Sequence, residues 1–399
     1  MESLDDVRGR PNVRSAAVVG IGETEFSPSS GRSSTRLALE ASLLALQDAG
    51  LRAADLDGVV VPSPVSATVE DLMTHLGITD LSFVANLAMG GAGPVGALHH
   101  ARLAVAMGVA DNVLVAFGNN GRSGARLGRR TPVVMRGDAP SLRRNFDGVH
   151  GLVTPAQFYA LWAQRYMHDH GWRDTLPLAE VARVQSRYGL MNANALVKQE
   201  ISHDDHQASR MISSPFRMYD CSREADGGVA FVISAATRHD RPVAVIRGAA
   251  ESHPPHPDQA TTRPEFLRTG MRAAADRAFA MAGWERSDIA CAELYDAFTF
   301  SVVWQLEELG LCAPGKSRDF VLSGETGPAG TLPVNTHGGL LSQAHLWGMN
   351  HVTEAVRQLR GTAGEAQVPR VSRVLVTGFG DFGDASVALL ERSTGELVT

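Results

Sequence analysis

The stretch Asn335-Thr-His-Gly-Gly-Leu-Leu-Ser-Gln-Ala-His345-Leu-Trp-Gly348 decides the fold of this chain. A pair of glycines precedes an apolar run, a histidine stands six residues after the second glycine, and another glycine follows three residues later. Adjacent glycines allow a tight turn and a close approach of the backbone, and the apolar run predicts a helix that starts at Gly338-Gly339. His345 then lies on that helix, either as a site residue or as a hydrogen-bonded core histidine.

Outward from this stretch, the second half of the chain alternates strands and helices. Short apolar runs predict strands, and a run with helical spacing predicts an amphipathic helix. We expect strands at 243–247, 289–295 and 373–378, and a helix at 263–283. The Gly-Gly turn falls between the last two strands.

The first half repeats this order. We expect strands at 16–20, 56–61 and 112–118, a helix at 34–50, and a helix that starts at Gly90-Gly91. The residues 48–56 (Asp-Ala-Gly-Leu-Arg-Ala-Ala-Asp-Leu) also parallel 281–289 (Met-Ala-Gly-Trp-Glu-Arg-Ser-Asp-Ile). Gly50 and Gly283 are predicted helix C-caps, where a left-handed backbone is needed. Chance can produce such joints, but the repeated order favours a duplicated α/β unit.

A long stretch between the halves interrupts the repeat. Residues 119–150 are rich in Gly, Arg and Pro, and helical spacing follows over 154–196. Connections of this length are usually functional or disordered, and we interpret this one as an insertion over the site. The expected domains are an N-terminal half at 14–118 and 220–240, the insertion at 119–219, and a C-terminal half at 241–399.

Composition excludes several classes of protein. The net charge is −6, 20% of the 399 residues are charged, and basic residues do not cluster as in a nucleic-acid-binding protein. No apolar run reaches the length of a membrane span or a secretory signal, so we expect a cytosolic protein. The three cysteines, Cys221, Cys291 and Cys312, are far apart, which is typical of free thiols and gives no metal cage.

The chain resembles the thiolase superfamily, and within it the sterol-carrier-protein and lipid-transfer-protein branch. Thiolases share the Asn-x-x-Gly-Gly motif with the spaced His and Gly, an Asn-Glu-Ala-Phe motif where this chain has Tyr295-Asp-Ala-Phe298, and a Gly-rich loop like Thr377-Gly-Phe-Gly-Asp-Phe-Gly383. The resemblance spans residues 14–392. It implies an α/β thiolase fold of duplicated αβαβα layered units, with an insertion in the first half.

The departures from the thiolase pattern decide the chemistry. Thiolases carry an acylated Cys at a helix start, where the N-terminus stabilises a thiolate. The corresponding window here, Asn86-Leu-Ala-Met-Gly-Gly-Ala-Gly93, contains no Cys, Ser or Thr. Thr377 or Gly378 replaces the second thiolase Cys, and Tyr295 replaces the Asn of Asn-Glu-Ala-Phe.

A chain without the nucleophile fits retro-aldol cleavage of a β-hydroxyacyl-CoA, which needs a base and an oxyanion donor but no acyl-enzyme. The resemblance extends to steroid side-chain aldolases. We expect Tyr295 to accept or relay the hydroxyl proton and His345 to act as oxyanion donor or acid. Asp296 either orients a partner or caps the helix that starts near Phe298. The alternatives are thiolase-like Claisen condensation or acyl transfer, and a non-catalytic acyl-CoA or lipid-binding scaffold.

Further residues are candidates for binding substrate or coenzyme A. His337 lies in the turn and could face the ligand, and Gly90 and Gly91 could receive the thioester oxygen. Arg122, with Arg126, Arg129 and Arg130, could meet phosphates, since guanidinium groups suit them, or form a solvated loop. The remaining candidates, taken from the family motifs, are Asn335 and Gly380.

The resemblance also implies the partners. Coenzyme A is part of the substrate, so no separate cofactor is expected, and no metal. Thiolase-fold chains form homodimers, and the steroid side-chain aldolases work with an OB-fold partner of the DUF35 family. We therefore expect a homodimer core within a heterotetramer.

Overall fold

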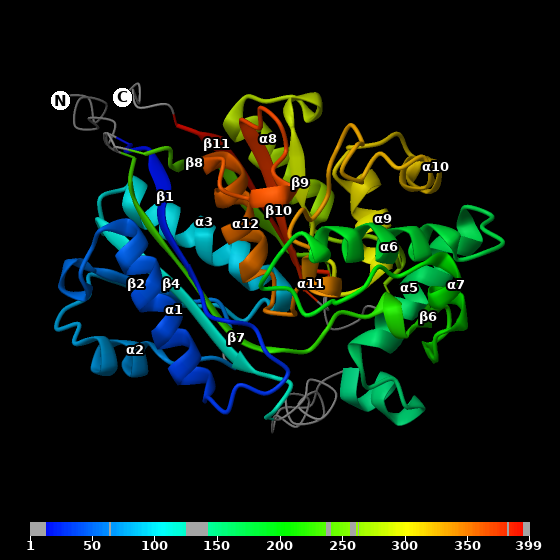
Figure 1. Cartoon of the computed structure of the whole chain (residues 1–399), viewed down its shortest axis with the longest axis horizontal. Coiled ribbons are helices and arrows are strands. Elements are labelled where there is room, and N and C mark those ends of the chain that lie inside the picture. The colour runs from blue at the N-terminus through cyan, green and yellow to red at the C-terminus, as the bar shows by residue number, and fades with distance from the viewer. Residues whose placement is uncertain are drawn as a thin grey trace, which may run out of the picture.

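The computed structural model describes residues 13–63, 65–124, 143–236, 241–255, 261, 263–380 and 383–393. One mixed sheet in the order β3-β2-β4-β7-β1-β8-β11-β10-β9 forms its framework (Figure 1). Its strands are β1 (Ala16–Glu23), β2 (Gly58–Val61), β3 (Phe83–Asn86), β4 (Asn112–Asn120), β7 (Asp226–Ala235), β8 (Ala244–Ser252), β9 (Cys291–Glu293), β10 (Arg373–Phe379) and β11 (Ala385–Arg392).

The strand order carries the predicted duplication. The first half runs β2-β4-β7-β1 and the second runs β8-β11-β10-β9, which is the same arrangement reversed. In the first half β2 and β4 are parallel, and the pairs β4–β7 and β7–β1 are antiparallel. In the second half β9 and β10 are parallel, and the pairs β10–β11 and β11–β8 are antiparallel. The halves join where β1 pairs with β8 through Ala17–Val245 and Val18–Ala244. Two copies of one unit therefore meet edge to edge.

The helices form the remaining layers. In the first half α1 (Ser34–Ala49) packs on β1, β4 and β7, and in the second half α8 (Met271–Ala282) packs on β8 and β11. Between the two halves lie α3 (Gly93–Ala106) and α12 (Met349–Arg360), which touch each other and strands of both units (Figure 1). The order is α1, the first half of the sheet, α3 and α12, the second half of the sheet, and α8, which confirms the expected thiolase fold.

The predicted caps end both outer helices. Gly50 and Gly283 have φ values of 69° and 67°, the left-handed conformation that glycine adopts without strain. Several expected boundaries were wrong. The helix that starts at Gly339 ends at Ser342, so His345 lies beyond it rather than on it. Helix α8 begins at Met271 rather than at 263, because residues 263–270 form a loop in which Arg263 Nη1 donates to the Arg268 carbonyl over 2.7 Å. The helical run at 154–196 is broken by a loop before Leu176.

The insertion packs mainly against the second half. It contains α5 (Pro155–Asp169), α6 (Leu176–Leu190), α7 (His203–Ala208), and a small hairpin of β5 (Met211–Ser213) and β6 (Phe216–Arg217). Tyr159 and Trp162 of α5 share one apolar core with Phe298 and Trp304. The other helices are α2 (Val69–Leu76), α9 (Thr299–Glu308), α10 (Ser317–Leu322) and α11 (Gly339–Ser342).

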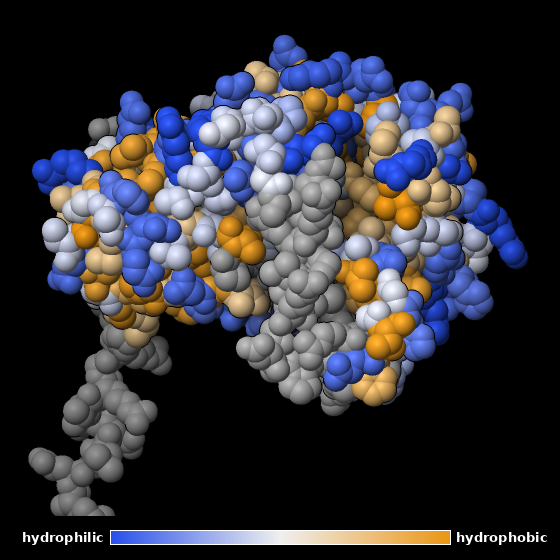
Figure 2. Space-filling view, turned by 90° about the horizontal axis from the view of Figure 1, so that it is seen from below, coloured by the Kyte–Doolittle hydropathy of each residue, from blue (hydrophilic) through white to orange (hydrophobic). Residues whose placement is uncertain are grey.

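None of the helices in the described part of the chain has the length and apolar character that a membrane crossing requires. On the face shown in Figure 2, hydrophobic residues are scattered among hydrophilic ones. All three cysteines are free thiols, as the sequence predicts.

Candidate active site

A cavity of about 800 Å³ lies where the insertion meets the two halves. It contains the Gly-Gly turn of the first unit, the motif histidine of the second, and the residue that replaces the Asn of Asn-Glu-Ala-Phe. The insertion supplies Thr154, Ala156, Leu196 and Lys198 to its wall. The other lining residues that matter here are Gly90, Gly91, Arg122, Cys221, Ser222, Tyr295, Phe298, Leu341, His345 and Trp347.

The backbone of Tyr295, just after β9, is fixed by two buried side chains. Its N–H donates to Thr377 Oγ1 over 2.9 Å, and its carbonyl accepts from Gln305 Nε2 over 2.8 Å. Thr377 Oγ1 in turn donates to Gln305 Oε1 over 2.6 Å. Thr377, which stands near the position of the second thiolase Cys, thus holds the tyrosine in place.

The Tyr295 ring lies in a slot between two glycines. A Cβ built on Gly91 would overlap the phenol Cζ and hydroxyl, and one built on Gly348 would lie 3.0 Å from Cδ2. Gly348 also has a φ of 90°, which few other residues adopt. The tyrosine hydroxyl therefore occupies the space that a side chain at position 91 would fill. A side chain at position 91 and the Tyr295 ring in this position therefore exclude each other.

His345 lies beside the Tyr295 hydroxyl. Its Nε2 is 3.4 Å from Tyr295 Oη, and its Nδ1 is 3.2 Å from Ser222 Oγ. The backbone N–H of His345 donates to the Arg223 carbonyl over 2.8 Å. Burial lowers the pKa of His345 to about 4, so the ring is neutral near pH 7. A chain of three polar groups, Ser222, His345 and Tyr295, thus faces the cavity.

Ser222 is a site residue that the sequence reasoning missed. No motif marks it, because it approaches His345 from the turn that leads into β7, far away along the chain. Its backbone N–H donates to the Ala297 carbonyl over 3.0 Å, which ties this turn to the Tyr-Asp-Ala-Phe motif.

Asp296 lies behind the cavity rather than in its wall. Its carboxylate accepts from the N–H groups of Leu340 and Leu341 over 2.8 and 3.3 Å, so it caps α11. The expected cap of the helix near Phe298 is wrong, because Phe298 itself is the N-cap of α9 and makes no side-chain cap bond. Asp296 joins two segments of the site without reaching the ligand space.

Three of the expected binding residues do not line the cavity. Asn335 bonds both polar atoms of its side chain to the Leu294 backbone, over 2.6 and 2.8 Å. The His337 ring is buried, with Nδ1 3.0 Å from Glu293 Oε2. A Cβ on Gly380 would lie 2.5 Å from the Met89 carbonyl oxygen, so this glycine lets the C-terminal loop pack on the Gly-Gly turn. All three lie outside the cavity wall and help to hold the segments that form it.

The basic candidates divide into two groups. Arg122 is exposed at the cavity, as are Lys198 and Arg210 from the insertion, which the sequence analysis did not single out. Arg126, Arg129 and Arg130 lie outside the described residues. Three cations at one opening can attract an anionic group of a ligand.

Cys221 also lines the cavity, although it is remote in sequence from the Gly-Gly turn. Burial, with a smaller contribution from Asp220, raises the pKa of its thiol to about 12. Because the thiolate is the nucleophilic form, this environment disfavours covalent catalysis by Cys221.

A metal ion has one candidate position among the described residues. Glu293, His337 and His351 offer ligand atoms within 4.8 Å of one another, and all three are buried. His337 Nδ1 lies 3.0 Å and His351 Nδ1 3.8 Å from Glu293 Oε2, which are ion-pair separations.

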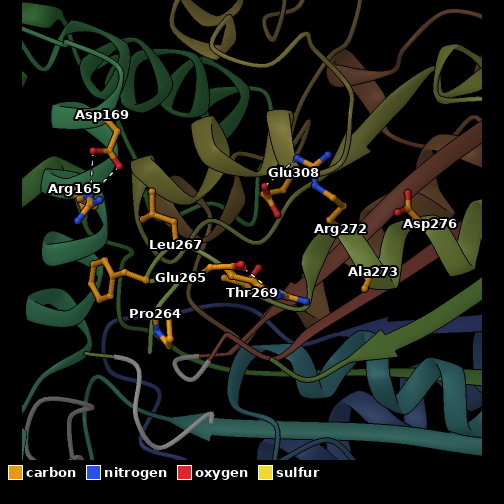
Figure 3. A pocket seen from close by; sticks show the side chains of 12 residues that line it. Arg165, Asp169, Pro264, Glu265, Leu267, Thr269, Arg272, Ala273, Asp276 and Glu308 are labelled. Atoms are coloured by element: carbon orange, nitrogen blue, oxygen red, sulfur yellow. Dashed lines mark hydrogen bonds and ion pairs between the residues drawn. The ribbon is translucent and has the colours of Figure 1, made fainter. Parts of the chain in front are cut away.

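A second cavity of about 660 Å³ lies between α5, α8 and the loop before α8 (Figure 3). Its charges are paired: Arg165 meets Asp169 at 2.8 Å, and Arg272 meets Glu308 at 3.1 Å. It shares no lining residue with the first cavity. Its chemistry is that of a polar surface hollow.

Comparison with known proteins agrees with this geometry. Residues 253–392 match the family model of the thiolase C-terminal domain. The chain is 40% identical to the 17-hydroxy-3-oxo-4-pregnene-20-carboxyl-CoA lyase of Mycobacterium tuberculosis, a match that covers 91% of this chain and 95% of the relative. It is also 40% identical to a steroid side-chain-cleaving aldolase of Thermomonospora curvata, over 91% and 94% of the two chains.

The chain belongs to the thiolase-like aldolases. This family contains carbon–carbon lyases, so the chain is an enzyme of that class. A solved Ltp2-ChsH2(DUF35) aldolase superposes on it with a TM-score of 0.88 and 36% identity, over 97% of this chain and 100% of the other. The thiolase-like aldolase fold thus extends over the whole described chain.

The glycine slot predicts the effect of a single methyl group in this aldolase. Gly91→Ala should displace the Tyr295 ring and lower kcat about a hundredfold, the loss that a shift of about 1 Å in a reacting group can cause. Steady-state assays of acyl-CoA cleavage measure it. Gly96→Ala is the matched control, since a Cβ there meets the flexible Met89 sulfur at 3.2 Å. Equal activity of both variants would contradict the slot.

Proposed function

We propose that this enzyme cleaves a β-hydroxyacyl-CoA thioester by a retro-aldol reaction, with a steroid side chain as the acyl group. The observation that carries the proposal is the Tyr295 hydroxyl, which fills the space of a side chain at position 91 and lies 3.4 Å from His345 Nε2. The names of two relatives, a steroid carboxyl-CoA lyase and a steroid side-chain-cleaving aldolase, support the substrate class.

The reaction moves one proton and breaks one bond. Tyr295 Oη accepts the proton of the substrate β-hydroxyl while it passes its own proton to His345 Nε2. The Cα–Cβ bond breaks, the Cβ–O bond becomes a ketone, and the electron pair moves onto the thioester as an enolate. His345 then returns a proton to Cα, which gives the shortened acyl-CoA. No bond to the enzyme forms.

The neutral imidazole and its hydroxyl partner suit this relay. With Nδ1–H donating to Ser222 Oγ, the lone pair of His345 Nε2 faces the tyrosine hydroxyl. Ser222 then sets the tautomer of His345. Gly90 and Gly91, at the start of the segment that leads into α3, line the same cavity and can direct N–H groups at the enolate oxygen.

The rest of the cavity fits a large apolar acyl group with an anionic carrier. Phe298, Leu341 and Trp347 give one part of the wall an apolar surface. Arg122, Lys198 and Arg210 at the opening can bind coenzyme A phosphates. Coenzyme A enters as part of the substrate, and the mechanism uses no further cofactor.

The proposal includes two kinds of protein partner. An OB-fold protein of the DUF35 family would join the chain, which the DUF35 aldolase among its structural relatives supports. A second copy would pair through β3, the edge strand of the sheet, where Val84 is 47% exposed. Together these contacts give a heterotetramer built on a homodimer.

The alternatives fit the site less well. Claisen condensation or acyl transfer needs an acylated side chain, and the raised pKa of Cys221 makes that thiol a poor nucleophile. A scaffold that only binds acyl-CoA would not need the polar chain of Ser222, His345 and Tyr295.

Tyr295→Phe tests the role of the hydroxyl. It keeps the ring in its slot but removes the proton acceptor, so kcat should fall by about 10² to 10⁴. Release of the ketone and of the shorter acyl-CoA, measured with the purified partner complex, gives the rate. Cys221→Ala should cleave like the unaltered enzyme. Loss of cleavage in Cys221→Ala together with full activity in Tyr295→Phe would exclude the retro-aldol mechanism.

The low pKa of His345 predicts the pH profile. The relay needs the neutral ring, so kcat should be lost only as the pH falls through about 4. An ordinary histidine would instead impose a loss near pH 6.5. We expect kcat to be level from pH 7 to about pH 5, measured with the fold monitored by circular dichroism. A decline centred between pH 6 and 7 that vanishes in His345→Gln would contradict the assignment.

A further inference from the structure

Directly beneath the cavity, one histidine lies between two carboxylates. His351 of α12 has Nε2 3.2 Å from Asp296 Oδ1 and Nδ1 3.8 Å from Glu293 Oε2. The three side chains are fully buried. Burying charged groups is costly unless they are paired, so the three have to be understood as one unit.

Each carboxylate of this unit is also bonded to a different segment. Glu293 Oε1 accepts from Thr336 Oγ1 over 3.0 Å, in the turn of the Asn-x-x-Gly-Gly motif. Asp296 accepts from the N–H groups at the start of α11. His351 therefore fastens β9, the motif turn and α11 to α12.

The two groups that carry the proposed chemistry are attached to these segments. Tyr295 immediately precedes Asp296, and its ring centroid is 6.5 Å from that of His351. His345 lies on the short connection between α11 and α12. His351 faces both Glu293 and Asp296, the carboxylates on either side of this tyrosine in the sequence.

We propose that His351 is a positioning residue, which bridges Glu293 and Asp296 and so keeps Tyr295 and His345 at the separation that proton transfer needs. The proposal rests on the proposed function, because that function assigns the transfer to this pair. His351 itself does not line the cavity.

The surrounding charges agree with this bridge. Burial alone would lower the pKa of His351, but the hydrogen bonds to Asp296 and Glu293 outweigh it and raise the pKa to about 9. Burial and the charge of Glu293 raise the pKa of the neighbouring Glu354. The other titratable groups near the unit include His337 on the motif turn, the neutral His345, Tyr188, Cys291 and Tyr295. A cationic His351 thus lies between two anions.

A bound metal ion is the competing explanation for this cluster. The separation of 3.0 Å between His337 Nδ1 and Glu293 Oε2 is that of a direct hydrogen bond, and His351 Nε2 is already engaged by Asp296. Direct ion pairs therefore account for these contacts. Metal analysis of the purified enzyme has to be part of the test.

His351→Gln is the primary test. The amide is uncharged and donates from a single nitrogen, so it cannot replace a cation whose two ring nitrogens face the two carboxylates, while the cavity wall is unchanged. We expect kcat to fall about tenfold or more while KM changes less than about threefold, because binding is not altered. His206→Gln is the matched control, since His206 and Asp220 form another fully buried pair at 2.8 Å. That control should lose stability but keep kcat.

A double variant covers the case in which His351→Gln does not fold. Glu293→Gln combined with His351→Gln removes one buried anion together with the cation, and we expect it to fold with the same low kcat.

Unchanged kcat in the folded variants, with Tyr295→Phe inactive, would overturn the positioning role and leave the proposed function intact. If the purified enzyme contains one metal ion per chain and His351→Gln loses it, the cluster is a metal site and not a set of ion pairs. Full activity of Tyr295→Phe would instead reject the proposed function.

Discussion

The close contact of the Tyr295 ring with Gly91 and Gly348 is the constraint on which the site depends. These glycines come from the two halves of the duplicated fold, and each leaves out a Cβ where the ring needs room. The absence of a side chain at Gly91 and the presence of the Tyr295 hydroxyl therefore depend on each other. A side chain at position 91 would require the ring to leave, and the polar chain to His345 would be broken.

Around this contact, buried side chains hold Tyr295 and His345 in place on the side away from the cavity, and the other side faces the cavity. Thr377 and Gln305 fix the Tyr295 backbone, while Ser222 fixes the second nitrogen of His345. Asn335 and Asp296 bind backbone groups and His337 pairs with Glu293, so none of the three faces the ligand. Most of the residues that define the family motif thus hold the turn, and of Asn335, Gly338, Gly339, His345 and Gly348 only His345 lines the cavity.

Much of the architecture could be predicted from the sequence, because the signals are local. Apolar runs gave the strands, and Gly50 and Gly283 marked the helix ends through a left-handed conformation that few other residues tolerate. The spacing around His345 gave the family. Contacts between distant segments left no local pattern: Ser222 approaches His345 from another turn, Cys221 enters the cavity wall, and Asp296 caps α11 instead of the nearer α9.

The central claim is that carbon–carbon cleavage here proceeds without an acyl-enzyme. Intact-protein mass spectrometry of samples quenched during steady-state turnover tests it most directly. A retro-aldol reaction should leave only the mass of the unmodified chain at every time point, while ketone and shortened acyl-CoA accumulate. A population heavier by the mass of an acyl group, which forms and decays with turnover and maps to Cys221 or another side chain, would contradict it.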